Sequence, residues 1–283
     1  MKNLNDTYTL QNGVKIPVVG FGTWQTPNDE VGYKAVLKAL EVGYTHIDTA
    51  AVYGNEVSVG KAIKDSGMKR EEIFLTSKIW NDAHGYEATL KAFDESLERL
   101  DTDYLDLYLI HWPNPLAFRD TWEETNAGTW KAMEELYAAG KIKAIGVSNF
   151  CERHIDALLK TAKVVPMVNQ IRLCPGDAKE ELVAYCEEKK ILLEAYSPLG
   201  TGKVFEVEAL KEMASKYDTT VAKVCLRWSL QRGFVPLPKS ITPERIADNA
   251  DIFGFDISAD DLNIISNLTG CCGQSDNPDE KPF

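Results

Sequence analysis

Four side chains of complementary chemistry stand at or near the ends of strand-like segments. Asp48, Lys78 and His111 each end a short apolar run, and Tyr53 follows Asp48 by five positions. A phenol is a poor acid at neutral pH, but a neighbouring ammonium lowers its pKa by favouring the phenolate. A carboxylate beside the lysine would keep it charged, and a histidine could orient a carbonyl group. The four residue types therefore predict a proton donor suited to carbonyl reduction.

Each of these residues alone also has a structural interpretation. Asp48 could cap a turn, Lys78 could be a satisfied charge at a barrel end, and His111 could bond to the backbone. Burying several charged groups together without a function is costly in free energy. Because all four residues lie at or near strand ends, we favour a functional site. Asp48, Tyr53, Lys78 and His111 are the candidate catalytic residues.

The other histidines fit structural positions. His46 stands inside the strand-like run that ends at Asp48, so we expect it to be packed in the interior. We expect His84 and His154 at the surface, in a loop and in a helix respectively.

These candidates need a scaffold that brings strand ends together, and the chain alternates between strand and helix patterns. Strands are expected at 18–22, 44–48, 73–78, 104–111, 142–147, 166–170, 191–196 and 234–236. Helices are expected at 29–42, 55–66, 86–100, 127–139, 152–162, 177–189, 207–217, 220–232 and 243–251. Asn55 and Thr242 are plausible helix N-caps.

Strict alternation implies a parallel sheet, and eight units in 283 residues fit a closed barrel better than an open sheet. The expected fold is α/β: a single eight-stranded parallel (β/α) TIM-type barrel domain over 1–283. An N-terminal β-hairpin cap is expected at 5–17 around Asn12-Gly13, and an irregular C-terminal tail at 270–283. Active sites of such barrels lie at the C-terminal ends of the strands.

Composition limits the classes of partner. The charged fraction is 26% and the net charge is −12, so the chain lacks the basic surface that nucleic-acid binding requires. The first ten residues lack the apolar core of a secretory signal. No apolar run approaches the roughly 20 residues of a membrane span. We therefore expect a cytoplasmic protein with no nucleic-acid or membrane partner, and we also expect it to be a monomer.

The six cysteines show neither a Cys-x-x-Cys pair nor a Cys/His spacing of ligands, so no metal site is expected. Reduced thiols in a cytoplasmic protein are the simpler interpretation. The adjacent pair Cys271-Cys272 could be a redox feature. The interpretation favoured is that they are simply two small residues near a mobile tail.

Seven segments in order resemble the aldo-keto reductase family. They are GYTHIDTAAVYGNE at 43–56, SKIW at 77–80, DYLDLYLIHWP at 103–113, GVSNF at 146–150, NQI at 169–171, AYSPLG at 195–200 and PKSITPERIADN at 238–249. The resemblance covers nearly the whole chain. It is closest to short bacterial-type members that reduce small aldehydes and 2,5-diketo-gluconic acid, and SDNPD at 275–279 adds to it.

The resemblance implies reduction of aldehydes or ketones to alcohols by hydride transfer from a nicotinamide cofactor bound across the barrel mouth. Tyr53 would be the general acid, and Lys78 would lower its pKa. Asp48 would anchor Lys78, and His111 would orient the substrate carbonyl.

The cofactor expected is NADPH/NADP+, with NADH disfavoured. Gly20-Phe21-Gly22 lacks the third glycine of a Rossmann fingerprint. By contrast, Lys239-Ser240, Thr242-Pro243 and Arg245 resemble an anion site at a helix N-terminus, although an ordinary capped helix is also possible. In the family this segment holds the adenosine 2′-phosphate. Asp248 stands where many relatives carry Glu.

The resemblance assigns further contacts to the cofactor and the substrate. The expected cofactor-binding residues are Gly22, Thr23, Trp24, Asp48, Ser148, Asn149, Gln170, Tyr196, Ser197, Leu199, Lys239, Ser240, Ile241, Arg245 and Asn249. Those expected at the substrate are Trp24, Tyr53, Trp80, His111 and Trp112. Ser148, Asn149 and Gln170 would bond the nicotinamide carboxamide, and Tyr196 would stack on its ring. Substrate specificity is expected to depend on loops at 112–126 and 200–206 and on the tail.

Two other functional classes remain open. A lyase could use Lys78 as a Schiff-base nucleophile, but pairing with an acid raises the lysine pKa and disfavours this. A cofactor-sensing protein could keep the barrel without turnover, because fold does not fix function.

Overall fold

An eight-stranded parallel barrel forms the centre of the computed structural model, which describes residues 1–273 and 275–283. Its strands pair in chain order: β3 (Phe21–Gly22), β4 (His46–Asp48), β5 (Phe74–Ile79), β6 (Leu105–Ile110), β7 (Ile142–Ser148), β8 (Val168–Arg172), β9 (Leu192–Tyr196) and β10 (Val235–Leu237). Two backbone bonds bring the first and last strands together: Gly20 N–H donates to Pro236 C=O at 3.1 Å, and Gly22 N–H to Pro238 C=O at 3.0 Å. The barrel is therefore nearly closed, as predicted.

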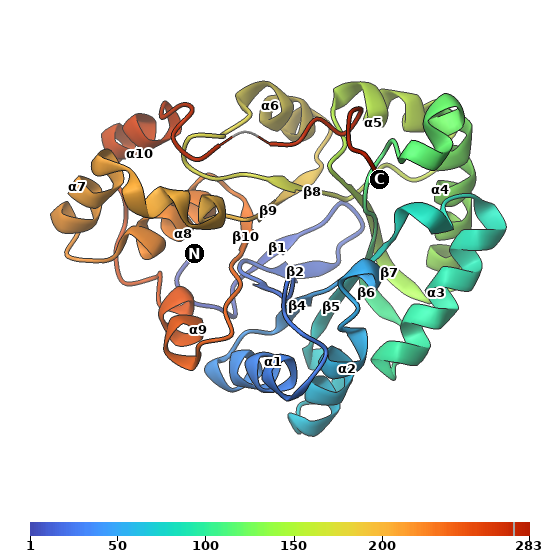
Figure 1. Ribbon diagram of the computed structural model, residues 1–283, viewed down its shortest axis with the longest axis horizontal. Coiled ribbons are helices and arrows are strands. Elements are labelled where there is room, and N and C mark those ends of the chain that lie inside the picture. The colour runs from blue at the N-terminus through green and yellow to red at the C-terminus, as the bar shows by residue number, and fades with distance from the viewer. Residues whose placement is uncertain (274) are drawn as a thin grey trace.

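Helices surround the barrel as an outer ring (Figure 1). They are α1 (Glu30–Val42), α2 (Glu56–Asp65), α3 (Tyr86–Leu100), α4 (Trp122–Ala138), α5 (Glu152–Leu159), α6 (Glu180–Glu188), α7 (Glu208–Lys216), α8 (Val221–Gln231), α9 (Pro243–Ala250) and α10 (Ala259–Ser266). Short 3-10 turns lie in the loops: η1 (Ala51–Tyr53), η2 (Arg70–Glu72), η3 (Asn81–Ala83), η4 (Leu116–Thr121) and η5 (Gly200–Glu206).

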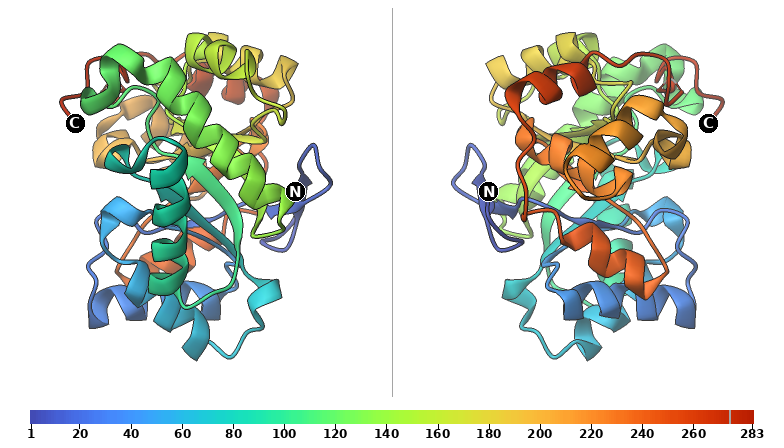
Figure 2. Two further views of the ribbon diagram at one scale, coloured as in Figure 1. Left: turned by 90° about the vertical axis from the view of Figure 1, so that its right-hand side faces the viewer. Right: turned by 90° about the vertical axis from the view of Figure 1, so that its left-hand side faces the viewer.

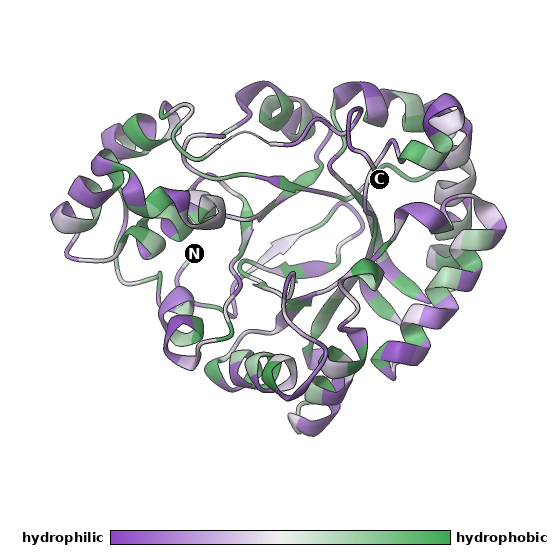
Figure 3. Ribbon diagram, in the orientation of Figure 1, coloured by the Kyte–Doolittle hydropathy of each residue, from purple (hydrophilic) through white to green (hydrophobic). Residues whose placement is uncertain are grey.

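Helix α1 shows how local sequence sets an element. Asp29 caps it, because its side chain accepts from the N–H groups of Val31 at 2.8 Å and Gly32 at 3.2 Å. Gly43 ends it at φ 109°, a left-handed conformation that glycine adopts readily. Figure 3 shows the alternation of apolar and polar residues around such helices. The helix therefore buries one face on the barrel and exposes the other to solvent.

The N-terminal hairpin covers one end of the barrel. β1 (Thr7–Thr9) and β2 (Lys15–Pro17) pair antiparallel, as the Asn12-Gly13 turn predicts. Leu10 and Ile16 pack against an interior cluster that includes Leu107. Figure 2 shows the hairpin at one end of the barrel and the C-terminus at the other. The C-terminal tail therefore lies at the end of the barrel where the strands have their C-terminal ends.

Some elements differ from the predictions. The strand expected at 18–22 is reduced to β3, and the helix expected at 127–139 begins at Trp122. Helix α10 was not predicted, because the segment 252–269 offers only a short apolar pattern that packs through Ile265. Among the described residues, none of the helices has the length and apolar character that crossing a membrane requires.

Candidate active site

A cavity of about 1330 Å³ opens at the C-terminal ends of the barrel strands. Most residues predicted from the sequence line it: Gly22, Trp24, Asp48, Tyr53, Trp80, His111, Trp112, Ser148, Asn149, Gln170, Tyr196, Ser197, Leu199, Lys239, Ser240, Arg245 and Asn249. Two predicted residues lie off its wall. Thr23 is fully buried and donates to the Asp48 carbonyl at 2.9 Å, and Ile241 is exposed.

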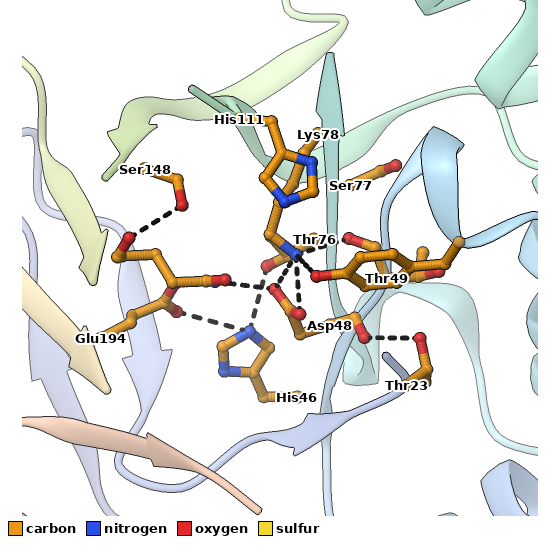
Figure 4. A network of polar contacts seen from close by, with 12 residues as sticks. Thr23, His46, Asp48, Thr49, Thr76, Ser77, Lys78, His111, Ser148 and Glu194 are labelled. Atoms are coloured by element: carbon orange, nitrogen blue, oxygen red, sulfur yellow. Dashed lines mark hydrogen bonds and ion pairs between the residues drawn. The ribbon is translucent and has the colours of Figure 1, made fainter. Parts of the chain in front are cut away.

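The four catalytic candidates meet at the floor of this cavity: Asp48, Lys78 and His111 lie together (Figure 4), and Tyr53 contacts Lys78 and His111. Lys78 Nζ is completely buried and donates to Asp48 Oδ1 at 2.7 Å and Oδ2 at 2.9 Å. The same ammonium donates to the Thr49 carbonyl at 2.8 Å and lies 3.4 Å from the Tyr53 hydroxyl. The His111 ring meets the Tyr53 ring edge-on, with centroids 5.7 Å apart. Strands β4, β5 and β6 thus bring together the groups that the sequence singled out.

Burial and charge oppose each other at the Tyr53 hydroxyl. Burial raises the Tyr53 pKa, the Lys78 ammonium lowers it, and Asp48 raises it again, so that the pKa ends above its ordinary value of 10. Lys78 therefore acts in the predicted direction but does not outweigh burial. The phenol is protonated at neutral pH, which suits a proton donor.

The charges of Lys78 and His111 are set by the same neighbours. Burial alone would lower the Lys78 pKa, but Asp48 and Tyr53 raise it above its ordinary value. The pKa of His111 falls well below 6.5, because burial and the charge of Lys78 both disfavour the imidazolium. The floor therefore holds one ammonium and one neutral imidazole.

A second group of polar side chains lines the wall beside these residues. Asn149 adopts φ 61°, a left-handed conformation that asparagine tolerates. Its Nδ2 donates to the His111 carbonyl at 3.0 Å, and its Oδ1 accepts from the Tyr196 hydroxyl at 2.8 Å. Ser148 Oγ donates to the main-chain carbonyl of Gln170 at 2.8 Å. These bonds fix polar groups and one aromatic face on a single wall.

The far end of the cavity reaches the N-terminus of α9. Helix α9 begins at Pro243, as predicted, but Thr242 does not cap it with its side chain. The Thr242 N–H instead donates to Ser240 Oγ at 3.0 Å. Lys239 and Arg245 both line the cavity here. The free N–H groups and two basic side chains form an arrangement suited to an anion.

Asn55 is the N-cap residue of α2 by position only. Its side chain accepts from Thr49 Oγ1 at 2.8 Å and donates to the carbonyls of Thr23 and Thr26, both at 2.9 Å. It therefore joins the loops after β3 and β4 instead of capping a helix.

The C-terminal tail forms part of the cavity wall. The Phe283 ring lies 5.4 Å from the Trp80 ring and 5.5 Å from the Trp112 ring, measured between centroids. Lys281 also lines the cavity. Trp24 stands at the mouth and is 49% exposed. All three tryptophans expected at the substrate line the cavity, and an aromatic residue of the tail lies beside two of them.

Two histidines are placed differently from the predictions. His84 is buried against the Phe118 ring, 6.2 Å away, and burial lowers its pKa to about 4. His154 is also buried and bonds Asp279 Oδ1 at 3.0 Å. Residues distant in the sequence cover both rings, so local patterns gave no sign of their burial.

Asp279 ties the tail to the barrel. It accepts from Asn114 Nδ2 at 2.9 Å, His154 Nε2 at 3.0 Å and Arg153 Nε at 3.0 Å. Although burial would raise the Asp279 pKa, bonds from Arg153, Asn114 and His154 lower it to about 2. Because its pKa is lowered, Asp279 contributes its full stabilisation of the folded protein above about pH 3.9, the pKa of aspartate in the unfolded chain. This stabilisation is lost as pH falls towards 2. The tail should stay anchored across the neutral range.

Asp279→Ala is expected to release the tail at pH 7. Limited proteolysis should cut residues 270–283 at least about tenfold faster than in the wild type, because local opening then costs less. Glu280→Ala is the control, since Glu280 is an exposed neighbouring acid. Equal cleavage rates for the wild type and Asp279→Ala would show that Asp279 does not anchor the tail.

Within the described part of the chain, no three His, Cys, Asp or Glu side chains gather as metal ligands would. All six cysteines are free thiols. Cys272 is buried on the cavity side, and its Sγ lies 3.7 Å from that of Cys271.

Comparisons with known proteins identify the family of this chain. The model of the Aldo/keto reductase family matches residues 18–269. The glyoxal reductase of Bacillus subtilis (strain 168) is 48% identical over 281 residues, 99% of each chain. The methylglyoxal reductase DkgA of Escherichia coli (strain K12) is 44% identical over 276 residues, 97% of this chain and 96% of its own.

A solved structure of a Gox0644 mutant in complex with NADPH has a TM-score of 0.91 at 39% identity, covering 98% of this chain and 99% of that one. The fold and the sequence thus match along nearly the whole chain. This chain belongs to the aldo/keto reductase family.

Proposed function

We propose that this protein reduces small aldehydes and α-dicarbonyls to alcohols with NADPH, with Tyr53 as the general acid. The observation that carries the proposal is the Tyr53 hydroxyl at the cavity floor, 3.4 Å from a fully buried Lys78 ammonium that Asp48 holds. Glyoxal and methylglyoxal appear in the names of two relatives, which supports this substrate class.

The residues on the cavity wall fit a nicotinamide dinucleotide. Gln170 Nε2 donates to Asp48 Oδ2 and Glu194 Oε2, both at 2.8 Å, so its carbonyl oxygen is free to accept a bond from a carboxamide. Lys239 and Arg245 at the α9 terminus would hold a 2′-phosphate. When bound, NADPH supplies the hydride of the reduction.

The chain's own groups would orient the carbonyl and move the proton. The neutral His111 ring can donate one hydrogen bond to the carbonyl oxygen without adding charge. Tyr53 would donate its proton to the same oxygen, and the Lys78 ammonium would stabilise the phenolate left behind. Asp48 keeps the ammonium in place. Trp24, the other wall tryptophans and Phe283 would exclude water from this step.

The test is NADPH oxidation at 340 nm with glyoxal, methylglyoxal and a series of larger aldehydes, run beside NADH. Turnover that favours NADPH and small dicarbonyls would support the proposal. A folded protein that binds NADPH but turns over none of these substrates would contradict it and favour the cofactor-sensing alternative.

Arg245→Gln should raise the Kd for NADPH by roughly tenfold, because one charge-assisted bond to the phosphate is lost. The Kd for NADH should stay within about twofold, since that cofactor has no 2′-phosphate. Fluorescence titration with both cofactors measures this. An equal loss of affinity for NADPH and NADH would argue against a phosphate contact by Arg245.

The lyase alternative finds little support in the geometry. A Schiff-base lysine must lose its proton, and the bidentate contact with Asp48 together with the raised pKa keeps Lys78 charged. Borohydride with a ketone substrate should therefore leave the mass of the protein unchanged.

A further inference from the structure

Glu194 is a buried carboxyl group that the proposed reduction does not use. It lies on β9, and its side chain is 0% exposed. Its Oε2 accepts from Gln170 Nε2 at 2.8 Å, and the same nitrogen donates to Asp48 Oδ2 at 2.8 Å. Figure 4 shows Glu194 facing His46 and Asp48 across the cavity floor. One amide nitrogen therefore links Glu194 to the carboxylate that holds Lys78.

These two bonds decide which way the Gln170 amide points. Asp48 is paired with an ammonium and is a strong acceptor, so it must face the NH₂ group and not the carbonyl. Glu194 accepts the second hydrogen of that NH₂ group. Because both hydrogens of the Gln170 NH₂ group are bonded in this way, the side-chain carbonyl oxygen of Gln170 is left to face the cavity. Glu194 is thus the second of the two contacts that fix this side chain.

The geometry also indicates that Glu194 is uncharged at neutral pH. The ammonium of Lys78 makes no bond to it. His46 Nε2 lies 3.6 Å from its Oε1, and burial lowers the His46 pKa to about 3. A buried carboxylate without a cation is costly. Burial, followed by the charge of Asp48, raises the Glu194 pKa to about 8.

The titratable groups around Glu194 come from few elements. His46 and Asp48 face it from β4, and Lys78 acts on it from β5. Strand β8 contributes the uncharged Gln170 amide. Strand β10, its other neighbour, has no titratable side chain. Glu194 is therefore the group in this cluster whose charge changes just above neutral pH.

We propose that Glu194 is a positioning residue that acts through Gln170: its uncharged carboxyl group holds the amide against Asp48 and keeps a second negative charge away from the catalytic lysine. The inference rests on the proposed reductase function, because it concerns the same Tyr53–Lys78 pair. Once Glu194 ionises, a second negative charge acts on Lys78, so that less of the lysine's positive charge is left to favour the phenolate of Tyr53. Reduction should therefore slow as pH rises through the ionisation of Glu194.

Glu194→Gln is the first variant, because glutamine keeps the shape and the accepting oxygen but cannot ionise. The kcat of the wild type for methylglyoxal should fall roughly three- to tenfold between pH 7 and pH 9, as one step of proton transfer weakens. Glu194→Gln should match the wild type at pH 7 within about threefold and lose this fall. Glu187→Gln, on the exposed side of α6, is the control and should keep the wild-type profile.

Glu194→Leu removes the acceptor as well as the charge. The Gln170 amide then loses one of its two contacts, and the Kd for NADPH should rise by about tenfold. Rescue of the Kd by Glu194→Gln would assign the effect to the accepting oxygen. This titration needs no turnover, so it tests positioning even where the reductase assay gives nothing.

A third readout is the pH dependence of Tm. Glu194 binds a proton up to about pH 8 when folded but only up to about 4.3 when unfolded, so stability falls as pH rises between these values. Glu194→Gln has no proton to lose and therefore does not lose stability in this way. The Tm of this variant should rise relative to that of the wild type from pH 5 to pH 8. The difference between Glu187→Gln and the wild type should be flat.

The outcomes separate this inference from the proposed function. A wild type without turnover overturns the reductase proposal alone, because the Tm and binding measurements still apply. Parallel Tm curves, or a Glu194→Gln profile that falls with pH like the wild type, overturn the role of Glu194 while leaving the reductase intact. If Glu194→Leu does not fold, the two readouts of Glu194→Gln decide the matter.

Discussion

Tyr53→Phe is expected to lower kcat for aldehyde reduction by roughly 10²- to 10⁴-fold, the usual contribution of a positioned general acid. Phenylalanine keeps the ring, including its edge contact with His111 at 5.7 Å between centroids, but has no proton to give. The cavity shape is unchanged, so the Kd for NADPH should stay within about twofold. Steady-state kinetics and a fluorescence titration on the same preparation measure both quantities.

Tyr33→Phe is the control for this prediction. Tyr33 lies on α1 and donates to Asp65 at 3.1 Å, away from the cavity. Tyr33→Phe removes the same kind of group, a phenol hydroxyl, and leaves the residues at the cavity floor unchanged. A Tyr53→Phe enzyme with a kcat within about threefold of wild type would mean that another group protonates the carbonyl oxygen.

Lys78→Met is expected to damage both stability and catalysis. Among the described residues, it leaves the buried Asp48 carboxylate with only the Gln170 bond, and breaking a buried pair in this way costs about 3–5 kcal/mol of unfolding free energy. The raised Lys78 pKa means that its contribution is fully present below the unfolded value of about 10.5 and is lost only above it. The loss should therefore be complete at pH 7. Urea unfolding followed by circular dichroism measures it.

Lys64→Met provides a matched comparison. Lys64 also pairs with a carboxylate, that of Asp101 at 2.5 Å, but its side chain is 70% exposed against 0% for Lys78. Water replaces a lost surface partner, so little change is expected. Adding Asp48→Asn to Lys78→Met should recover part of the stability, because the unpaired charge is removed. An unfolding midpoint of Lys78→Met equal to that of Lys64→Met would contradict the buried-pair argument.

The regular repetition of the sequence accounts for the success of the barrel prediction. Each strand-like run is followed by a helical pattern, and parallel strands with intervening helices have few closed arrangements at this length. The hairpin followed from Asn12-Gly13, and the helix expected at 29–42 ends where α1 ends, at Val42. Element boundaries were less certain: α4 begins five residues before the predicted position, and α10 was missed.

The catalytic candidates were visible for a related reason. Asp48, Lys78 and His111 are charged or polar residues that follow apolar runs, and that change of character marks a strand end. The barrel brings such ends to one face regardless of their separation in the chain. Their meeting could therefore be predicted, but the 2.7 Å contact of Lys78 with Asp48 needed the tertiary structure.

Other features depend on contacts between distant segments. His84 is buried because Phe118 covers it, and His154 because Asp279 reaches it from the tail. Phe283 packs beside Trp80 and Trp112 for the same reason. No local pattern encodes these meetings.

The sequence by itself determined the order of the elements, the residue types at the strand ends and hence the family and the class of chemistry. The tertiary structure alone decided the electrostatics of the site, because a pKa depends on burial and on charges that the fold brings near. It placed the carboxyl group of Glu194 2.8 Å from the Gln170 amide nitrogen and raised its pKa to about 8, and it left the Tyr53 pKa above its ordinary value despite Lys78. Periodicity reports which face of an element is buried, whereas these effects depend on distances between residues far apart in the chain.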